Sequence, residues 1–206
     1  MTIGIIDIGV GNIGSVVNAV YNQGWDSISI TKPEDLGSVS HLIIPGVGSF
    51  SFIMKRLREL NLDASICDFA SQGSPILGIC LGMQILGDAG SEGFHSLGLG
   101  LISGEVNLIN RTAGLPLPHV GWNDVAEVNN HPLLDGVKPG VDFYFVNSYC
   151  FSATNRENVI LETEYGECFP AMIAKKNVVG MQFHPEKSQR NGLRLLDNFC
   201  LWDGAC

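Results

Sequence analysis

The chain has 206 residues, which is enough for one domain with a large hydrophobic core. Its 12 Lys and Arg residues against 21 Asp and Glu residues give a formal net charge of −9, which argues against a general binder of nucleic acid or of an anionic membrane. Hydrophobic residues make up 45% of the chain and charged residues 16%, a balance that excludes an intrinsically disordered protein.

The sequence carries neither a recognisable targeting pattern nor a metal-binding pattern. The N-terminus lacks the basic segment of a secretory signal, and no apolar run reaches the roughly 18 residues that a membrane-spanning helix needs. The six cysteines form no C-x-x-C pair, and no Cys/His cluster has the spacing of a zinc site. We therefore expect a cytoplasmic protein with free thiols, no metal ion and no cofactor.

The first ninety residues alternate short apolar runs with segments of helical periodicity. This alternation implies parallel strands that helices cover on both faces. Strands are expected over residues 3–8, 28–30, 41–44 and 75–79. Helices are expected over residues 12–23, 53–60, 64–71 and 81–86.

Beyond residue 87, glycine-rich turns separate short alternating segments, which indicate antiparallel additions and the last strand of the sheet. These segments cover residues 105–110, 124–128, 143–146, 159–164, 171–174 and 178–183. A final helix carries Leu193, Leu196 and Phe199 toward the core. The expected fold is a single α/β domain over residues 1–206, with a mostly parallel central sheet, helices on both faces and antiparallel additions.

The segment GICLG over residues 78–82 follows an expected strand and precedes an expected helix. This is the nucleophile-elbow pattern, with Cys80 where hydrolases place serine. Gly78 and Gly82 would let the neighbouring chain pass close to a strained turn, and the helix N-terminus would favour the thiolate. The alternative is a buried cysteine between two turn glycines.

A thiol nucleophile needs a base, and His184 is the best candidate. In an extended chain His184 and Glu186 project to the same side, and Pro185 between them disfavours a helix. A base oriented by a carboxylate has this arrangement. The alternative is a strand-end histidine beside a surface glutamate; with the elbow present, we favour a Cys80–His184–Glu186 triad.

Two backbone amides are candidate donors to an oxyanion. The N–H of Leu81 follows the nucleophile. The peptide of Val47, between two glycines in residues 45–48, could supply the second donor, although an ordinary turn would have the same sequence.

Two further patterns have competing interpretations. Residues 9–14 form a G-x-G-x-x-G pattern, but no acidic residue ends the second strand, so a tight turn is favoured over a dinucleotide site. Trp122 is expected in a loop, either as a core residue or as an anchor for a partner.

The sequences GICLGMQ and HPE, about a hundred residues apart, resemble those of the class I (triad) glutamine amidotransferases. Within that family the chain is similar to the glutaminase subunits of imidazole glycerol phosphate synthases. The similarity spans nearly the whole chain. The similar segments are residues 7–12, 45–50, 118–123, 144–149 and 182–188.

The resemblance implies hydrolysis of glutamine to glutamate and ammonia through a thioester on Cys80. Gln84 would hold the substrate, and Glu92 would bind its α-amino group. The backbone at Gly48, Ser148 and Tyr149 would hold the rest of the amino acid.

The resemblance also implies a heterodimer in which ammonia passes to a separate (β/α)8-barrel cyclase or synthase subunit. Asn12, Trp122 and Lys187 would lie at that interface. The implied pathway is histidine biosynthesis.

Three residues depart from the family pattern: Asn147 replaces a usual His, Ile8 a usual Tyr and Ser103 a usual Pro. They raise the alternative of a paralogue whose barrel partner amidates a surface-polysaccharide sugar. Two other classes stay open, namely a cysteine peptidase or amidase that acts alone, and an inactive scaffold for a barrel partner.

Overall fold

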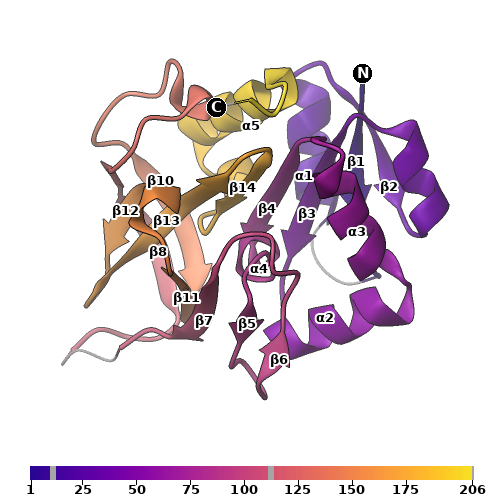
Figure 1. The fold of residues 1–206 in the computed structure, drawn as a ribbon. Coiled ribbons are helices and arrows are strands. Elements are labelled where there is room, and N and C mark those ends of the chain that lie inside the picture. The colour runs from indigo at the N-terminus through magenta and orange to yellow at the C-terminus, as the bar shows by residue number, and fades with distance from the viewer. Residues whose placement is uncertain (10–12, 111–113, 206) are drawn as a thin grey trace.

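A computed structural model describes residues 1–9, 13–110 and 114–205. Its centre is an eight-stranded sheet with the order β2-β1-β3-β4-β14-β13-β12-β9 (Figure 1). The first five are parallel: β2 (Asp26–Ile30), β1 (Thr2–Ile6), β3 (His41–Gly46), β4 (Ile76–Cys80) and β14 (Val178–Met181). The antiparallel extension consists of β13 (Cys168–Lys175), β12 (Val159–Glu164) and β9 (Ala126–Glu127).

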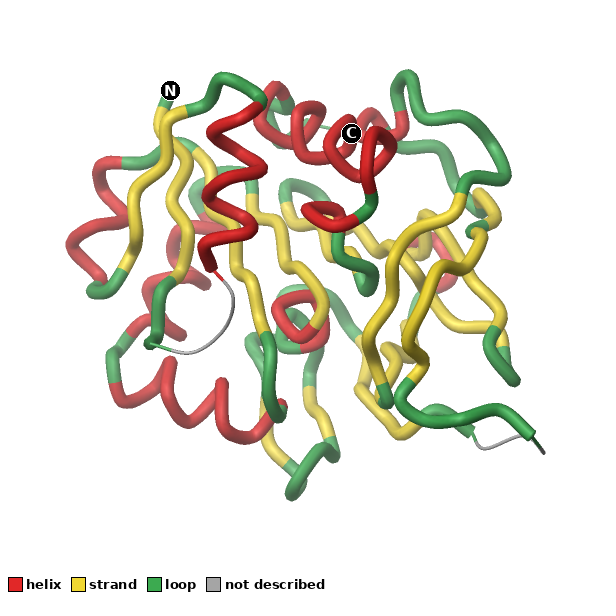
Figure 2. Tube along the Cα trace, turned by 180° about the vertical axis from the view of Figure 1, so that it is seen from behind, coloured by secondary structure: helices red, strands yellow, loops and turns green. Residues whose placement is uncertain are grey.

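Helices cover both faces of this sheet (Figures 1 and 2). Helices α1 (Ile13–Asn22) and α5 (Gln189–Leu201) pack on one face, and α2 (Phe50–Glu59) and α3 (Leu62–Ser71) lie on the other. The strands supply both cores by alternation: in β3, Ile43 belongs to the first core, and Leu42 and Ile44 belong to the second. A nearly continuous apolar strand is therefore buried on both sides, as in other parallel sheets.

Two smaller sheets complete the fold beside the antiparallel end. One pairs β10 (Asp142–Asn147) with β8 (His119–Asp124), and the other has the order β11-β7-β5-β6. The latter strands are β11 (Tyr149–Ala153), β7 (Gly104–Leu108), β5 (Ala89–Gly90) and β6 (Ser96–Leu97). Helix α4 (Leu81–Gln84) and the 3-10 turns Pro33–Ser38, Pro132–Leu134, Arg156–Asn158 and Pro185–Lys187 connect the strands.

The predicted fold class is confirmed, and several predicted boundaries are wrong. Strand β3 does not stop before Pro45; it continues to Gly46, which pairs with Cys80 of β4. Proline is tolerated there because the pairing of β3 with β1 ends at Ile43, so Pro45 has a partner strand on only one side. The segment predicted over residues 124–128 is split between β8 and β9, and Trp122 lies on β8 rather than in a loop.

Three strands were not predicted from the sequence, and one predicted turn lies outside the described residues. Strands β5 and β6 have two residues each, too few to show alternation, and β11 follows β10 after a single residue. Val10, Gly11 and Asn12 lie outside the described residues, so the tight turn expected there stays a prediction. Within the described residues, no helix is long and apolar enough to cross a membrane.

The turn after β4 has the predicted strain. Cys80 has a φ of 55° and a ψ of −112°, which a residue with a side chain rarely adopts. A Cβ on Gly82 would lie 1.7 Å from the carbonyl oxygen of Ile44, and a Cβ on Gly78 would lie 2.4 Å from the carbonyl oxygen of Gly82. The two glycines therefore permit a backbone-to-backbone contact that no other residue could make.

We expect Gly82→Ala to lower the free energy of unfolding by about 3 kcal/mol or more, because the new methyl group overlaps backbone that cannot move independently. Urea denaturation followed by circular dichroism measures the change. Gly37→Ala is the matched control, since the space around Gly37 is open. Equal stability of the two variants would contradict the close contact.

Candidate active site

A cavity of about 270 Å³ opens at the carboxyl ends of β3 and β4. Its wall combines the turn after β4 with the connection between β10 and β11. Thirteen residues line it: Val47, Gly48, Cys80, Leu81, Gln84, Glu92, Pro118, Val146, Asn147, Ser148, Tyr149, His184 and Lys187. The cavity therefore brings together most of the residues that the sequence singles out, although its thirteen lining residues come from six separate segments of the chain.

Cys80 lies at the junction of β4 and α4, with its side chain largely buried. Its Sγ is 3.7 Å from the carbonyl oxygen of Val146 and 3.7 Å from Nε2 of Gln182. Helix α4 has only four residues, Leu81–Gln84, and is shorter than the predicted one. Its dipole is correspondingly small, so side chains must supply most of the electrostatic support for the sulfur.

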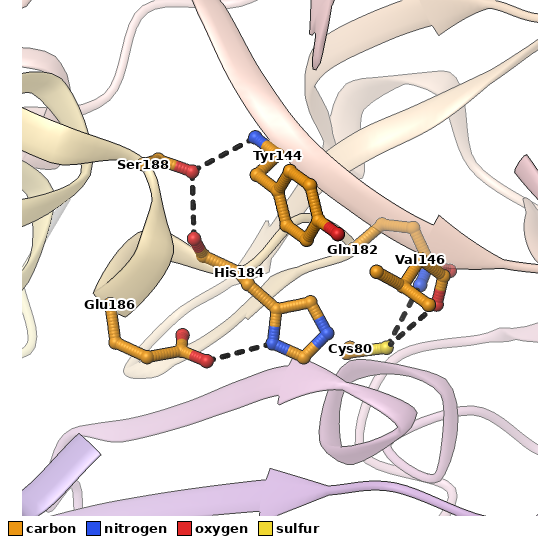
Figure 3. Close-up of polar contacts among 7 residues, drawn as sticks. All are labelled: Cys80, Tyr144, Val146, Gln182, His184, Glu186 and Ser188. Atoms are coloured by element: carbon orange, nitrogen blue, oxygen red, sulfur yellow. Dashed lines mark hydrogen bonds and ion pairs between the residues drawn. The ribbon is translucent and has the colours of Figure 1, made fainter. Parts of the chain in front are cut away.

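The His184 ring lies between the Glu186 carboxylate and Cys80 (Figure 3). Nδ1 of His184 is 2.8 Å from Oε1 of Glu186, and both side chains are at least nine-tenths buried. Oε2 of Glu186 has no hydrogen-bond partner among the described residues, so the imidazole is the main compensation for this buried charge. The carboxylate orients the ring and favours its protonated form.

The pKa of His184 reflects these opposing influences. Burial lowers it, but hydrogen bonds to Cys80 and Glu186 and their negative charges raise the pKa of His184 to about 9. By contrast, burial lowers the pKa of His41, His119 and His131. Of these four histidines, His184 is therefore the one whose surroundings favour the protonated form at neutral pH.

The other described cysteines are poorly suited to nucleophilic attack. Burial raises the pKa of Cys67 and Cys168, and it raises the pKa of Cys150 and Cys200 to about 12. All four are free thiols, as is Cys80. None of the four lines the cavity that contains His184.

Val47 and Leu81, the two predicted oxyanion donors, are brought together by strand pairing. Gly46 and Cys80 are partners in the parallel register of β3 and β4, so the next residue of each strand emerges at the same edge. Both Val47 and Leu81 line the cavity. The two predicted donor residues therefore lie on a common wall of the cavity.

The predicted substrate-binding residues Gly48, Gln84, Glu92, Ser148 and Tyr149 also line the cavity. Glu92 accepts a hydrogen bond at 3.0 Å from the backbone N–H of Phe50. Burial raises the pKa of Glu92, and that hydrogen bond partly opposes the change.

Residue 147 is the clearest departure from the family pattern within the cavity. Nδ2 of Asn147 donates to the carbonyl oxygen of Tyr149 at 3.1 Å. Its Oδ1 is buried without a hydrogen-bond partner among the described residues. The wall of the cavity therefore contains an acceptor with unused capacity.

Two predicted interface residues are linked by an aromatic ring. Trp122 on β8 pairs with Tyr144 on β10, and their ring centroids are 6.0 Å apart. Nζ of Lys187 lies 5.9 Å from the centroid of Tyr144. Trp122 is 43% exposed, so this row reaches the surface. Asn12, the third predicted residue, lies outside the described residues.

Sequence reasoning missed Gln182 and Ser188. Oγ of Ser188 donates to the carbonyl oxygen of His184 at 2.7 Å and accepts from the N–H of Tyr144 at 3.0 Å (Figure 3). It thereby holds the turn that carries His184 against β10. Alternation could have identified Gln182, which lies two residues before His184 and projects to the same side; nothing comparable marks Ser188.

The chain is similar to known proteins over nearly its whole length. The sequence profile described as Glutamine amidotransferase class-I matches residues 5–202. Imidazole glycerol phosphate synthase subunit HisH 1 of Prochlorococcus marinus (strain MIT 9313) is 47% identical over 204 residues, which cover 95% of this chain and 94% of that protein. The subunit HisH of Desulfitobacterium hafniense (strain DSM 10664 / DCB-2) is 42% identical over 200 residues, with coverage of 97% and 94%.

Solved structures support the fold. PurLQS from Thermotoga maritima superposes with a TM-score of 0.78 at 18% identity, covering 97% of each chain. A crystal structure described as a glutamine amidotransferase superposes with a TM-score of 0.76 at 21% identity, covering 98% of this chain and 99% of that one. At such identities the likeness establishes the architecture alone.

We expect Glu186→Gln to lower the pKa of His184 from about 9, although the contribution of Cys80 remains. The neutral amide removes a favourable charge while burial still disfavours the imidazolium. An NMR titration of the imidazole resonances measures this change. Glu59→Gln, on the exposed side of α2, is the control; a titration of His184 that is the same in both variants would contradict the role of Glu186.

Proposed function

Because the chain belongs to the class I glutamine amidotransferases, we propose that it is the glutaminase subunit of an imidazole glycerol phosphate synthase. It hydrolyses glutamine to glutamate and ammonia and delivers the ammonia to a (β/α)8-barrel subunit. The observation that carries the proposal is the convergence of Cys80, His184 and Glu186 at a cavity lined by the expected substrate-binding residues. Residues 1–206 act as one glutaminase domain, in the cytoplasm.

In the first half of the reaction, the Cys80 sulfur attacks the carboxamide carbon of glutamine. The carbonyl oxygen becomes negatively charged, and the amides of Leu81 and Val47 stabilise it. The His184 imidazolium gives its proton to the leaving nitrogen, so ammonia departs and a thioester with Cys80 remains.

In the second half, neutral His184 takes a proton from water, and the resulting hydroxide attacks the thioester carbon. The carbon–sulfur bond breaks, glutamate leaves, and the sulfur and imidazole return to their starting pair. Glu186 retains its charge throughout and stabilises each protonated state of His184. The two halves sum to glutamine plus water giving glutamate, ammonia and one proton, which the newly formed carboxyl group releases.

Ammonia needs a protected route, because in water at neutral pH it is mostly protonated and loses its nucleophilic electron pair. A separate barrel subunit that covers the cavity supplies that route. The row Trp122–Tyr144–Lys187 is the part of the described surface that would contact it, since it runs from the cavity wall to an exposed aromatic residue. Asn12 is proposed for the same interface on the family resemblance alone.

The pathway is proposed to be histidine biosynthesis. The relatives from Prochlorococcus marinus and Desulfitobacterium hafniense carry the name of an imidazole glycerol phosphate synthase subunit, and the matches cover nearly their full length. These names favour that acceptor over the alternative, a surface-polysaccharide sugar.

Cys80→Ala tests the proposed chemistry. We expect the variant, in complex with its barrel partner, to lose glutamine hydrolysis by at least roughly a thousandfold, because no nucleophile remains. Synthesis from added ammonium salts should persist, since the partner's own site is untouched. Both activities are measured in the same preparation; loss of both, or retention of both, would contradict the role assigned to Cys80.

Trp122→Ala tests the interface. We expect the dissociation constant for the barrel subunit to rise about tenfold or more, since buried aromatic anchors dominate such interfaces. Titration of labelled partner measures the affinity. Tyr21→Ala, which removes an exposed aromatic side chain from the far end of α1, should have no effect. Equal effects of the two substitutions would argue that Trp122 lies outside the interface.

A further inference from the structure

A chain of buried amides leads from the backbone of Tyr149 to the sulfur of Cys80. Nε2 of Gln84 lies 3.0 Å from the carbonyl oxygen of Tyr149 and 2.9 Å from Oε1 of Gln182. Nε2 of Gln182 in turn lies 3.7 Å from Sγ of Cys80. Gln182 is fully buried, and Gln84 nearly so.

The polarity of this chain follows from its first member. A backbone carbonyl oxygen can only accept a hydrogen bond, so the group of Gln84 that faces Tyr149 must be its NH2. That NH2 also faces Gln182, which must therefore present its carbonyl oxygen. The remaining end of the Gln182 amide, the end beside Cys80, is then the NH2. The orientation of Gln182 is thus fixed by the backbone and does not depend on the state of the sulfur.

We propose that Gln182 is a dedicated hydrogen-bond donor to the Cys80 sulfur and stabilises its thiolate form. This rests on the proposed role of Cys80 as nucleophile. It adds to that role a residue outside the triad that contacts the reacting atom.

The two groups nearest the sulfur have opposite preferences. The carbonyl oxygen of Val146, 3.7 Å away, can interact favourably only with a protonated thiol. The N–H of Gln182 favours the charged sulfur, because a hydrogen bond to an ion is stronger than one to a neutral acceptor. Donation by Gln182 therefore offsets the effect of Val146. Since Gln182 is bonded at its other end to Gln84, it cannot turn away when the thiol is protonated.

The register of the sheet explains the placement. In the parallel pairing of β14 with β4, Gly180 is opposite Gly78 and Met181 is opposite Ile79. One more step along both chains brings Gln182 beside Cys80. His184 follows two residues later, so the donor and the base approach the sulfur from the same segment, which directly follows β14.

The test is the pH profile of Cys80 alkylation by iodoacetamide, with the modified residues identified by mass spectrometry. Gln182→Met removes both ends of the amide. Gln182→Glu keeps an oxygen acceptor for Gln84 and removes the amide donor to the sulfur. For both variants we expect the rate at pH 7 to fall about tenfold and the profile to move to higher pH, because the thiolate has lost a donor.

The controls address folding and nonspecific effects. Gln72→Glu makes the same chemical change at an exposed position and should leave the profile unchanged. Cys200 is 1% exposed and reports unfolding, since it becomes reactive only when the chain opens. If the variants do not fold, NMR of the unmodified chain replaces them: the side-chain NH2 protons of Gln182 should shift over the pH range in which the alkylation rate changes.

The outcomes separate this inference from the proposed function. If Cys80 of the unmodified chain is alkylated no faster than Cys200, its role as the nucleophile is contradicted. If alkylation of Cys80 is fast and its pH profile is the same in both Gln182 variants, the donor role of Gln182 is overturned and the role of Cys80 as nucleophile is not. The donor role is also overturned if the alkylation rate falls in Gln182→Met but not in Gln182→Glu, because the effect would then act through Gln84. Gln182 NH2 resonances that do not shift over this pH range would also overturn the donor role.

Discussion

The contact between the backbones of Gly82 and Ile44 is the constraint on which the site depends. It holds the turn after β4 against the end of β3, at a separation that excludes any side chain on Gly82. Cys80 is thereby kept in a strained conformation that exposes its sulfur to the cavity. The same contact aligns Val47 with Leu81, so a single packing requirement places the nucleophile and both candidate oxyanion donors.

The neighbour of β4 on its other side is β14, and this adjacency supplies the rest of the chemistry. Because the strands are parallel, their carboxyl ends meet at one edge, and the residues that follow β14 lie beside those that follow β4. Phe183 packs into the core between Gln182 and His184 and fixes the direction of both. Ser188 then ties the His184 turn to β10, so a buried residue and a short polar bridge keep the base in place.

Local patterns were sufficient to predict that the residues of the proposed triad, Cys80, His184 and Glu186, lie together. The elbow glycines and the alternation of His184 with Glu186 are properties of short segments, and parallel pairing brings such segments together predictably. Strand β11 and the strand position of Trp122 were not predictable, because antiparallel pairing after residue 87 depends on contacts distant in the sequence. The length of α4 and the bridge made by Ser188 likewise depend on tertiary packing, which periodicity does not encode.

In the proposed function a partner subunit uses the ammonia, and this chain supplies the chemistry that releases it. What this chain must provide is a sulfur that reacts with a glutamine-shaped molecule and with little else. Burial raises the pKa of the Cys150 and Cys200 thiols to about 12 and makes them weak nucleophiles, whereas Cys80 has a base, a candidate donor and an open cavity around it. Selectivity among the cysteines is therefore a direct consequence of the fold.

The most direct test is covalent labelling with a diazoketone analogue of glutamine, followed by peptide mass spectrometry. We expect one adduct, on Cys80, whose formation slows when excess glutamine is present. Adducts confined to other cysteines, or labelling of Cys80 that glutamine does not slow, would contradict the claim that this cavity is a glutaminase site.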